Sequence, residues 1–317
     1  MTTATDPAAG TEAVPRYPAL AEGRWMDVMG LRTWWTESGE TDGAPLVLVY
    51  GGNFGPPTFG GGNCAMVWAD TFEGLARSTR VITYDRPGNG FTEPPVEDDD
   101  YTMEFVIDHL IAFLEQLGCG PVHLLGHSRG GFIVARMALL RQDLVRSVTI
   151  VTSGTLGPGV GMNAVALAGN PYEPTSLEGM TWVHQGYSHK TEHVTEEWMR
   201  PFVDLLHEEQ YQTMLERIES NRLLERFFIP ELQRDKRETL RWLEEGRLQR
   251  PVHIVWGLSD RTVPVRLGYD LYDMLARHEA RVTLSVVDKS GHFPYREHPE
   301  WFRGVVESFL EEVDSDV

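Results

Sequence analysis

A serine lies at the centre of the sequence Gly126-His127-Ser128-Arg129-Gly130, after an apolar run at residues 122–126 and before a helix-like segment. A tight turn between a strand and a helix needs nearly side-chain-free flanking positions, and such a turn exposes the serine oxygen at the helix N-terminus. The helix dipole and the free N–H groups there can hold a developing negative charge. The pattern therefore predicts Ser128 as a nucleophile.

A serine nucleophile needs a base that removes its proton, and histidine suits this role at neutral pH. His292 follows the last strand-like run and precedes the last helix-like segment. A loop in that place can lay an imidazole ring over the serine. His298, His278 and His253 are poorer candidates, because they fall at a helix entrance, at a helix end and inside a strand. We therefore expect His292 to be the base.

The base needs a carboxylate that holds its second ring nitrogen and favours its charged form. Asp260 comes immediately after the strand-like run 252–256, which would place it at the carboxyl edge of a sheet beside His292. Asp85 also follows a strand, but it precedes the serine and is better suited to forming a turn. Asp288 ends its own strand and is expected to shape that loop. Asp260 is the predicted acid.

Acyl chemistry also needs two N–H donors aimed at one oxygen. The amide of Arg129, directly after the nucleophile, supplies one in this interpretation. The second is expected from the glycine-rich turn after Tyr50, at the amide of Gly52, although these glycines could simply make a loop.

The elements that would position these groups alternate along the chain. Apolar, β-branched runs typical of strands buried in a parallel sheet occur at residues 45–50, 80–84, 122–126, 145–151, 252–256 and 282–287. Helical periodicity occurs at residues 103–117, 130–141, 265–277 and 299–312. Residues 24–37 predict two antiparallel strands that turn at Gly30. The fold class predicted is α/β, with a mostly parallel central sheet flanked by helices.

The middle of the chain lacks strand signals. We interpret residues 155–245 as a helical lid inserted into one domain, whose core comprises residues 19–154 and 246–317. Residues 1–18 have no apolar signal-peptide core and are expected to form a flexible leader.

Composition excludes several functions. The chain has 28 Lys and Arg against 47 Asp and Glu, a formal charge of −19, which argues against nucleic acid and anionic membrane surfaces as partners. Its two cysteines form no CxxC pair and suggest neither a disulfide framework nor a zinc site, so no metal is expected. No apolar stretch is long enough to span a membrane. A cytoplasmic location is the expectation.

Taken together, these motifs resemble the α/β-hydrolase superfamily over roughly residues 24–153 and 248–314. The resemblance rests on GHSRGG at the nucleophile, DRPGNG after the second parallel strand, GLSDRTVP at the acid and SGHFPYREHP at the base. Within the superfamily the chain looks most like the meta-cleavage product hydrolases, with proline iminopeptidases and small esterases nearby. The resemblance implies a Ser-His-Asp hydrolase that needs no cofactor, with a small organic molecule as its substrate.

The sequence departs from the meta-cleavage pattern in three places. Tyr50 stands where those enzymes usually have His, and Phe293 where they usually have Trp. Their Gly-x-Gly-Pro-Gly turn is replaced by Gly51-Gly52-Asn53-Phe54-Gly55-Pro56 with a longer glycine tail to Gly62. Those hydrolases commonly hold the substrate carboxylate with a lid arginine, and Arg200 is the candidate here. The Arg129 side chain could meet an anionic substrate group or could lie on the surface. The remaining candidates for substrate contact are Asn53, Phe54, Trp182, Trp198 and Phe293; the lid aromatics among them could equally form the core of the lid.

Three functions remain open at this point. The first is hydrolysis of an ester, a lactone or a meta-cleavage type carbon–carbon bond through an acyl-enzyme. The second is an aminopeptidase resembling proline iminopeptidase, which would need lid acids to hold a free amine, and only Glu192, Glu196 and Glu197 are available. The third is a non-catalytic binding protein of the same fold. A homo-oligomer is compatible with each of the three.

Overall fold

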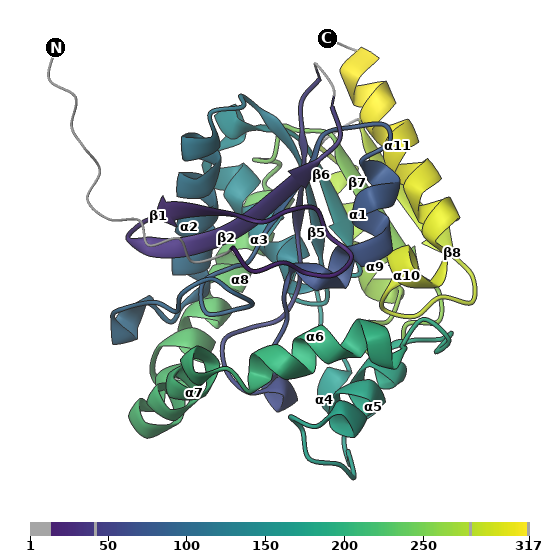
Figure 1. The fold of residues 1–317 in the computed structure, drawn as a ribbon. Helices are drawn as coiled ribbons and strands as arrows, with labels where there is room; N and C mark the ends of the chain where they lie inside the picture. The colour runs from purple at the N-terminus through teal and green to yellow at the C-terminus, as the bar shows by residue number, and fades with distance from the viewer. Residues whose placement is uncertain (1–13, 41–42, 279–280, 316–317) are drawn as a thin grey trace, which may run out of the picture.

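A computed structural model describes residues 14–40, 43–278 and 281–315. Its centre is an eight-stranded sheet with the order β1-β2-β4-β3-β5-β6-β7-β8 (Figure 1). The strands are β1 (Arg24–Val28), β2 (Leu31–Ser38), β3 (Leu46–Val49), β4 (Val81–Tyr84), β5 (Val122–His127), β6 (Val145–Val151), β7 (Val252–Gly257) and β8 (Val282–Val287). The predicted strand runs all match strands of this sheet, and the predicted fold class is confirmed.

The first two strands of the sheet run antiparallel, and the others run parallel. β1 pairs with β2 through a turn at Met29 and Gly30, and β2 pairs antiparallel with β4. From β4 through β3, β5, β6 and β7 to β8 every pairing is parallel. The inner strands β3, β4, β5 and β7 are buried at every residue, which explains why they read as continuous apolar runs. Parallel pairing brings the carboxyl ends of these six strands to one edge.

Helices cover both faces of the sheet (Figure 1). α2 (Met103–Leu117) and α3 (Arg129–Leu140) pack on each other, and α1 (Ala69–Leu75) packs against α11 (Pro299–Ser315). The remaining core helices are α9 (Arg266–Leu275) and the short α10 (Pro294–Glu297). Short 3-10 turns lie at Pro57–Phe59, Ala65–Trp68, Asp98–Asp100 and Gln142–Leu144.

Helix α2 shows how local sequence sets these elements. The Thr102 hydroxyl accepts a hydrogen bond from the Phe105 amide at 3.1 Å, which caps the first turn. Gly118 ends the helix with φ of 60°, a left-handed conformation that glycine adopts without strain. Both ends agree with the range 103–117 that the helical periodicity predicted.

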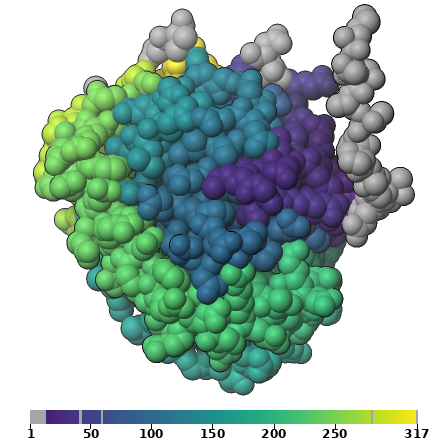
Figure 2. Space-filling model, turned by 90° about the vertical axis from the view of Figure 1, so that its left-hand side faces the viewer, coloured from purple at the N-terminus to yellow at the C-terminus, as the bar shows by residue number. Residues whose placement is uncertain are grey.

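The segment between β6 and β7 carries helices only, within the part of the chain that the structure describes. They are α4 (Asn163–Ala166), α5 (Leu177–Tyr187), α6 (Glu196–Leu206), α7 (Glu209–Asn221), a π-helical turn at Leu224–Phe228, and α8 (Ile229–Glu244). Helices α4 to α7 lie together beyond one end of the sheet, and Figure 2 shows the later part of this layer from the side (Figures 1 and 2). α8 differs, because it returns to the core and packs on α2 and α3. No helix in the described ranges is long and apolar enough to cross a membrane.

The N-terminal segment is packed earlier than predicted. Residues 1–13 of the expected leader lie outside the described part of the chain. Tyr17, which was assigned to that leader, is 1% exposed, and its hydroxyl donates a 2.6 Å hydrogen bond to Asp85. Asp85 also accepts from the Tyr50 hydroxyl and from the amides of Ala65 and Phe91. The packed body therefore begins before residue 18, because a buried carboxylate needs donors and Tyr17 supplies one.

Candidate active site

The turn between β5 and α3 holds Ser128 in a conformation that few residues adopt. Its φ is 53° and its ψ is −121°, and its amide donates to Val151 O at 2.8 Å. A methyl group on Gly126 would lie 2.2 Å from the Gly130 carbonyl oxygen, and one on Gly130 would lie 2.0 Å from Val49 O. Glycine is required at both positions for steric reasons, and the strained backbone between them presents the serine at the helix start.

His292 and Asp260 come together at the carboxyl ends of β7 and β8. His292 Nδ1 lies 2.7 Å from Asp260 Oδ2, and both residues are at least 95% buried. A carboxylate can only accept, so Nδ1 carries the proton and Nε2 of the neutral ring is left with a free lone pair. This tautomer is the one that a general base requires.

The second carboxylate oxygen of Asp260 is held by its own loop. Oδ1 accepts from the Thr262 amide at 2.8 Å, the Thr262 hydroxyl at 2.7 Å and the Val263 amide at 2.8 Å. Three donors on one oxygen stabilise the charged carboxylate and fix its orientation. Asp260 therefore holds the His292 imidazole from a carboxylate whose position is already fixed.

His127 connects the serine turn to the histidine loop. Its Nε2 lies 2.9 Å from the His292 carbonyl oxygen, so Nε2 carries the proton, and its Nδ1 accepts from the Tyr295 hydroxyl at 3.3 Å. The rings of His127 and His292 are 4.8 Å apart between centroids. Burial lowers the pKa of His127 well below its usual range, and the nearby His292 adds to this. A neutral His127 therefore fastens the loop of the candidate base beside the candidate nucleophile.

The glycine-rich turn after β3 faces the serine. A methyl group on Gly51 would lie 2.7 Å from Ser128 Cβ and 3.2 Å from its Oγ. The amides of Gly52 and Arg129 have no hydrogen-bond partner among the described residues. The Asn53 amide, by contrast, donates to Gly60 O at 2.9 Å. The two amides expected to form the oxyanion hole are therefore both available.

Arg86 holds this turn from behind, a role that the sequence did not suggest. Its guanidinium donates to Gly51 O at 2.7 Å and to Gly52 O at 3.3 Å, and it lies over the Tyr50 ring at 4.7 Å. Because the carbonyl oxygens point toward Arg86, the amides of the same peptide units are directed away from it. The side chain is 1% exposed.

Glu297 is a second residue that sequence reasoning missed. Its carboxylate accepts from the amides of Gly291 and Phe293, which flank the candidate base, at 2.8 and 3.4 Å. It also accepts from the amides of His189 and Lys190 in the insertion, at 2.9 and 2.8 Å. Burial raises the pKa of Glu297, and the four amides oppose this. The only sequence signal was an acid in the apolar stretch after His292.

Several predicted substrate contacts lie close to the candidate base. Phe293 is 5% exposed and stacks on His184 of α5, with the rings 5.8 Å apart and 9° from parallel. Trp198 of α6 packs edge-on against Phe293 at 6.2 Å. Phe54 packs edge-on against Phe228 at 6.1 Å. These aromatic side chains join the insertion to the core beside the loop of His292 and the glycine-rich turn after β3.

Two other predicted contacts are not brought to the site. The side chain of Arg200 is 49% exposed and pairs with Glu196 one helical turn away. Trp182 on α5 is half-buried, and no hydrogen bond or ring contact joins it to the candidate triad within the described residues. Arg200 faces away because the apolar face of α6, with Trp198, Phe202 and Leu206, is the one that docks.

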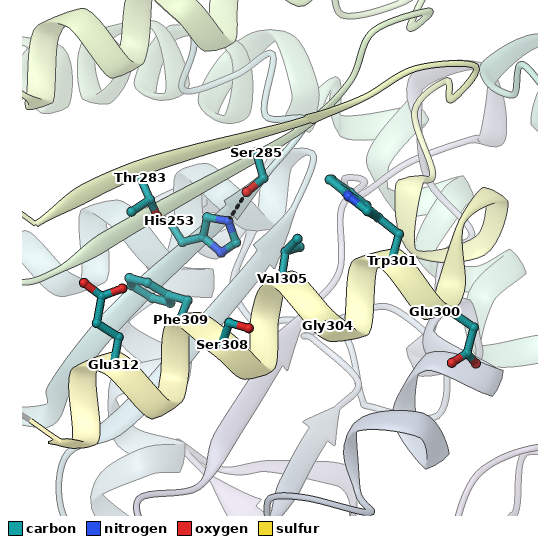
Figure 3. Close-up of a pocket in the computed structure, with 10 residues that line it drawn as sticks. All are labelled: His253, Thr283, Ser285, Glu300, Trp301, Gly304, Val305, Ser308, Phe309 and Glu312. Atoms are coloured by element: carbon teal, nitrogen blue, oxygen red, sulfur yellow. Dashed lines mark hydrogen bonds between the residues drawn. The ribbon is translucent and has the colours of Figure 1, made fainter.

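A groove on another part of the molecule has a histidine and a serine in its lining. This groove of about 490 Å³ runs between α11 and the strands β7 and β8, with His253, Ser285 and Trp301 in its lining (Figure 3). His253 Nε2 lies 2.9 Å from Ser285 Oγ, and burial lowers the pKa of His253 to about 4. His253 lies near the amino end of β7, whereas Asp260 follows the carboxyl end of that strand. The groove is therefore separate from the candidate triad.

Comparison with known proteins places the chain in a family. The alpha/beta hydrolase fold family matches residues 45–299. A 2-hydroxymuconate semialdehyde hydrolase of Pseudomonas sp. (strain CF600) is 26% identical over 301 residues, covering 92% of this chain and 95% of that protein. A 2-hydroxy-6-oxo-6-(2'-aminophenyl)hexa-2,4-dienoic acid hydrolase of Metapseudomonas resinovorans is 25% identical over 292 residues, covering 90% of each.

Solved structures agree on the fold. A meta-cleavage product hydrolase from Pseudomonas fluorescens IP01 (CumD) superposes with a TM-score of 0.72 at 24% identity, covering 92% of this chain and 98% of that one. A putative lipase from Acinetobacter baumannii AYE superposes with a TM-score of 0.73 at 18% identity, covering 94% and 93%. The resemblance inferred from the sequence motifs is confirmed. Because the family match extends over most of the chain, this protein belongs to the α/β hydrolase fold family.

Proposed function

We propose that this protein is a serine hydrolase that cleaves a bond next to a carbonyl group in a small organic molecule, with Ser128, His292 and Asp260 as its triad. The observation that carries the proposal is the 2.7 Å hydrogen bond from His292 Nδ1 to Asp260, in a loop that His127 joins directly to the strained serine turn. A neutral imidazole with this tautomer can act as a base only through Nε2.

The proposed reaction begins when His292 Nε2 accepts the hydroxyl proton of Ser128 as its oxygen attacks the carbonyl carbon. The amides of Gly52 and Arg129 donate to the oxyanion that forms. The proton on His292 then passes to the leaving group as the bond to the carbonyl carbon breaks, which leaves an acyl-enzyme. A water molecule, deprotonated by His292, attacks that ester and releases the acid and Ser128.

The first candidate for the bond that this protein cleaves is a carbon–carbon bond, and the second is an ester bond. The curated relatives named above are hydrolases of 2-hydroxymuconate semialdehyde and of a 2-hydroxy-6-oxo-dienoic acid. If this chain acts on such a diketone, the leaving group is a carbon atom. The dienol must then tautomerise to its keto form, with a proton moving from oxygen to carbon, before the carbon–carbon bond breaks. An ester leaves as an alcohol and needs no such step.

The aminopeptidase alternative finds little support in the insertion. Glu192, Glu196 and Glu197 are all exposed, and Glu196 pairs with Arg200 at the surface. A free amine held near the serine would need a carboxylate that faces the site. For the binding-protein alternative, no member of the predicted triad is missing from the chain.

A fluorophosphonate probe combined with a substrate panel tests the proposal. We expect the probe to label the full-length wild-type protein and not the Ser128→Ala variant, because the probe reacts only with an activated serine. The panel compares 4-nitrophenyl esters with a ring-cleavage dienoate. Faster turnover of the dienoate would favour the carbon–carbon substrate. Labelling that persists in Ser128→Ala would contradict the assignment of the nucleophile.

A further inference from the structure

The Arg129 side chain next to the candidate nucleophile is a cation without an anion. Its Nη1 is completely shielded, and it has no hydrogen-bond partner among the described residues. No carboxylate of the described chain pairs with it, although the protein has 47 acidic residues against 28 Lys and Arg. A shielded charge is costly unless it is paired. The absence of an internal partner in so acidic a chain suggests that the partner comes from outside.

The surroundings of Arg129 place its guanidinium between the core and the insertion. Its central carbon lies 5.5 Å from the centroid of the Phe228 ring, at the end of the π-helical turn. It also interacts electrostatically with Tyr187 of α5. The Tyr187 ring stacks on that of His292, with the centroids 4.9 Å apart and the planes 27° from parallel. The charge therefore lies on the insertion side of the serine, beside the candidate base.

Two further cations reinforce the positive potential there. Arg86 is close enough to Arg129 to repel it, and this repulsion adds to burial in lowering the pKa of Arg129 to about 10. Burial lowers the pKa of Lys236 on α8, and the charge of Arg129 lowers it further. The Lys236 ammonium group donates to the carbonyl oxygens of Gly159 at 2.9 Å and Gly154 at 3.5 Å. Arg129 remains charged at neutral pH. An anion placed here would relieve the repulsion between cations as well as gain hydrogen bonds.

We propose that the Arg129 guanidinium is the anchor of an anion subsite, which binds a carboxylate on the acyl part or the leaving part of the substrate. The proposal rests on the serine hydrolase function above and narrows it to substrates that carry a carboxylate beside the scissile carbonyl. Arg129 then serves twice: its amide faces the oxyanion, and its side chain selects the substrate by charge. The guanidinium of Arg129 lies over the face of the Phe228 ring, which holds the guanidinium in place without using its N–H groups.

Matched esters separate this role from the others that Arg129 could have. The test uses 4-nitrophenyl hydrogen succinate and 4-nitrophenyl butyrate, which share a leaving group and differ in a terminal carboxylate against a methyl group. The variants are Arg129→Met, which keeps the bulk of the side chain, and Arg129→Lys, which keeps its charge. Arg226→Met is the control, because Arg226 is exposed and lies over the neighbouring Phe227 at 4.8 Å.

We expect Arg129→Met to reduce kcat/KM for the anionic ester by roughly 10- to 100-fold more than for the neutral one, chiefly through KM. Arg129→Lys should recover part of this difference, and Arg226→Met should leave the ratio unchanged. An equal loss on both esters would overturn the proposal and assign the side chain to oxyanion stabilisation or to packing. An unchanged ratio in a folded Arg129→Met variant would overturn it as well.

A second measurement does not depend on turnover or on one variant folding. Glutarate should slow fluorophosphonate labelling of wild-type Ser128 competitively, and should do so much less in Arg129→Lys or Arg129→Met. Equal protection in wild type and both variants would contradict the subsite. Absence of any labelling in the wild type would instead count against the serine hydrolase function, so the two failures are distinguishable.

Discussion

The sheet edge that carries the candidate triad and the helical insertion beyond it are held in different ways. At the sheet edge, local hydrogen bonds fix the candidate catalytic groups: Asp260 Oδ1 alone accepts from two backbone amides and one hydroxyl of its own loop. The insertion meets the site through a few separate contacts, such as the His292 amide with Tyr187 O at 2.9 Å and the Tyr211 hydroxyl with Gly55 O at 2.8 Å. The reaction should therefore be insensitive to the insertion's surface, and substrate choice should depend on its inner side chains.

The largest effect should come from the sheet edge. Replacing Asp260 by Asn keeps the shape but offers the His292 ring an amide that can also donate, so the imidazole is no longer held in the tautomer that a base needs. We expect kcat on a 4-nitrophenyl ester to fall by roughly 10³- to 10⁴-fold with little change in KM.

Asp288→Asn is the matched control, since Asp288 is exposed and its carboxylate accepts only from the Lys289 amide among the described contacts. Its kcat should stay at the wild-type value. If Asp260→Asn were equally active in a steady-state assay, the assignment of Asp260 as the acid would be wrong.

The next effect should come from Glu297, whose carboxylate joins the histidine loop to the insertion. Glu297→Gln leaves some of the four amides around it without an acceptor, because one side-chain oxygen becomes an NH₂ group. We expect kcat/KM to fall by roughly tenfold, and unfolding free energy to fall by about 1–3 kcal/mol. Denaturant unfolding and ester kinetics on the same samples measure the two losses.

Glu300→Gln provides the comparison, because Glu300 lies three residues later and its side chain is 79% exposed. A positioning role for Glu297 also predicts an altered pH profile of kcat, since the His292 loop is no longer held. A loss of stability with unchanged kinetics would reduce Glu297 to a purely structural residue.

The difference between the two regions also explains what the sequence could predict. Ser128, Asp260 and His292 follow strands, and parallel strands bring their carboxyl ends to one edge whatever the side chains are. The order of elements was therefore enough to predict that Asp260 and His292 meet, and their side chains are 2.7 Å apart. The ends of α2 were predictable for a similar reason, because Thr102 and Gly118 act within their own turns.

The insertion resisted prediction because helical periodicity does not say where each face docks. Arg200 and Trp198 are two residues apart on α6, yet only the second is buried against Phe293. Arg86 and Glu297 were missed because their partners are backbone groups distant in sequence, and a hydrogen bond to a backbone group leaves no residue pattern to detect. Tyr17 was misplaced because its hydrogen-bond partner, the Asp85 side chain, lies 68 residues away in the sequence, and no local pattern links the two.

A smaller effect should follow from loosening the insertion where it meets the glycine-rich turn after β3. Tyr211→Phe removes the 2.8 Å hydrogen bond to Gly55 O and leaves the ring in place. A neutral hydrogen bond of this kind contributes about 1 kcal/mol, so kcat/KM should fall roughly fivefold. Tyr269→Phe, on an exposed tyrosine of α9, should have no effect. An unaffected Tyr211→Phe enzyme would show that the turn is fixed by Arg86 and the core alone.

The smallest effect concerns the buried carboxyl group of Asp85, which Tyr50 joins to the glycine-rich turn after β3. Burial raises the pKa of Asp85 from 3.8 to about 6, against the opposing effect of its hydrogen bonds. Because the folded state binds this proton more tightly than the unfolded chain, the contribution of Asp85 to stability is greatest at low pH and declines as pH rises through about 6.

Asp85→Asn cannot titrate. The stability advantage of wild type over Asp85→Asn should therefore shrink by about 1 kcal/mol between pH 5 and pH 7.5, measured by urea unfolding. A gap that widens over this range would mean that the hydrogen bonds from Tyr17, Tyr50 and the two amides outweigh burial, and that the core side of the site is built around a stable carboxylate.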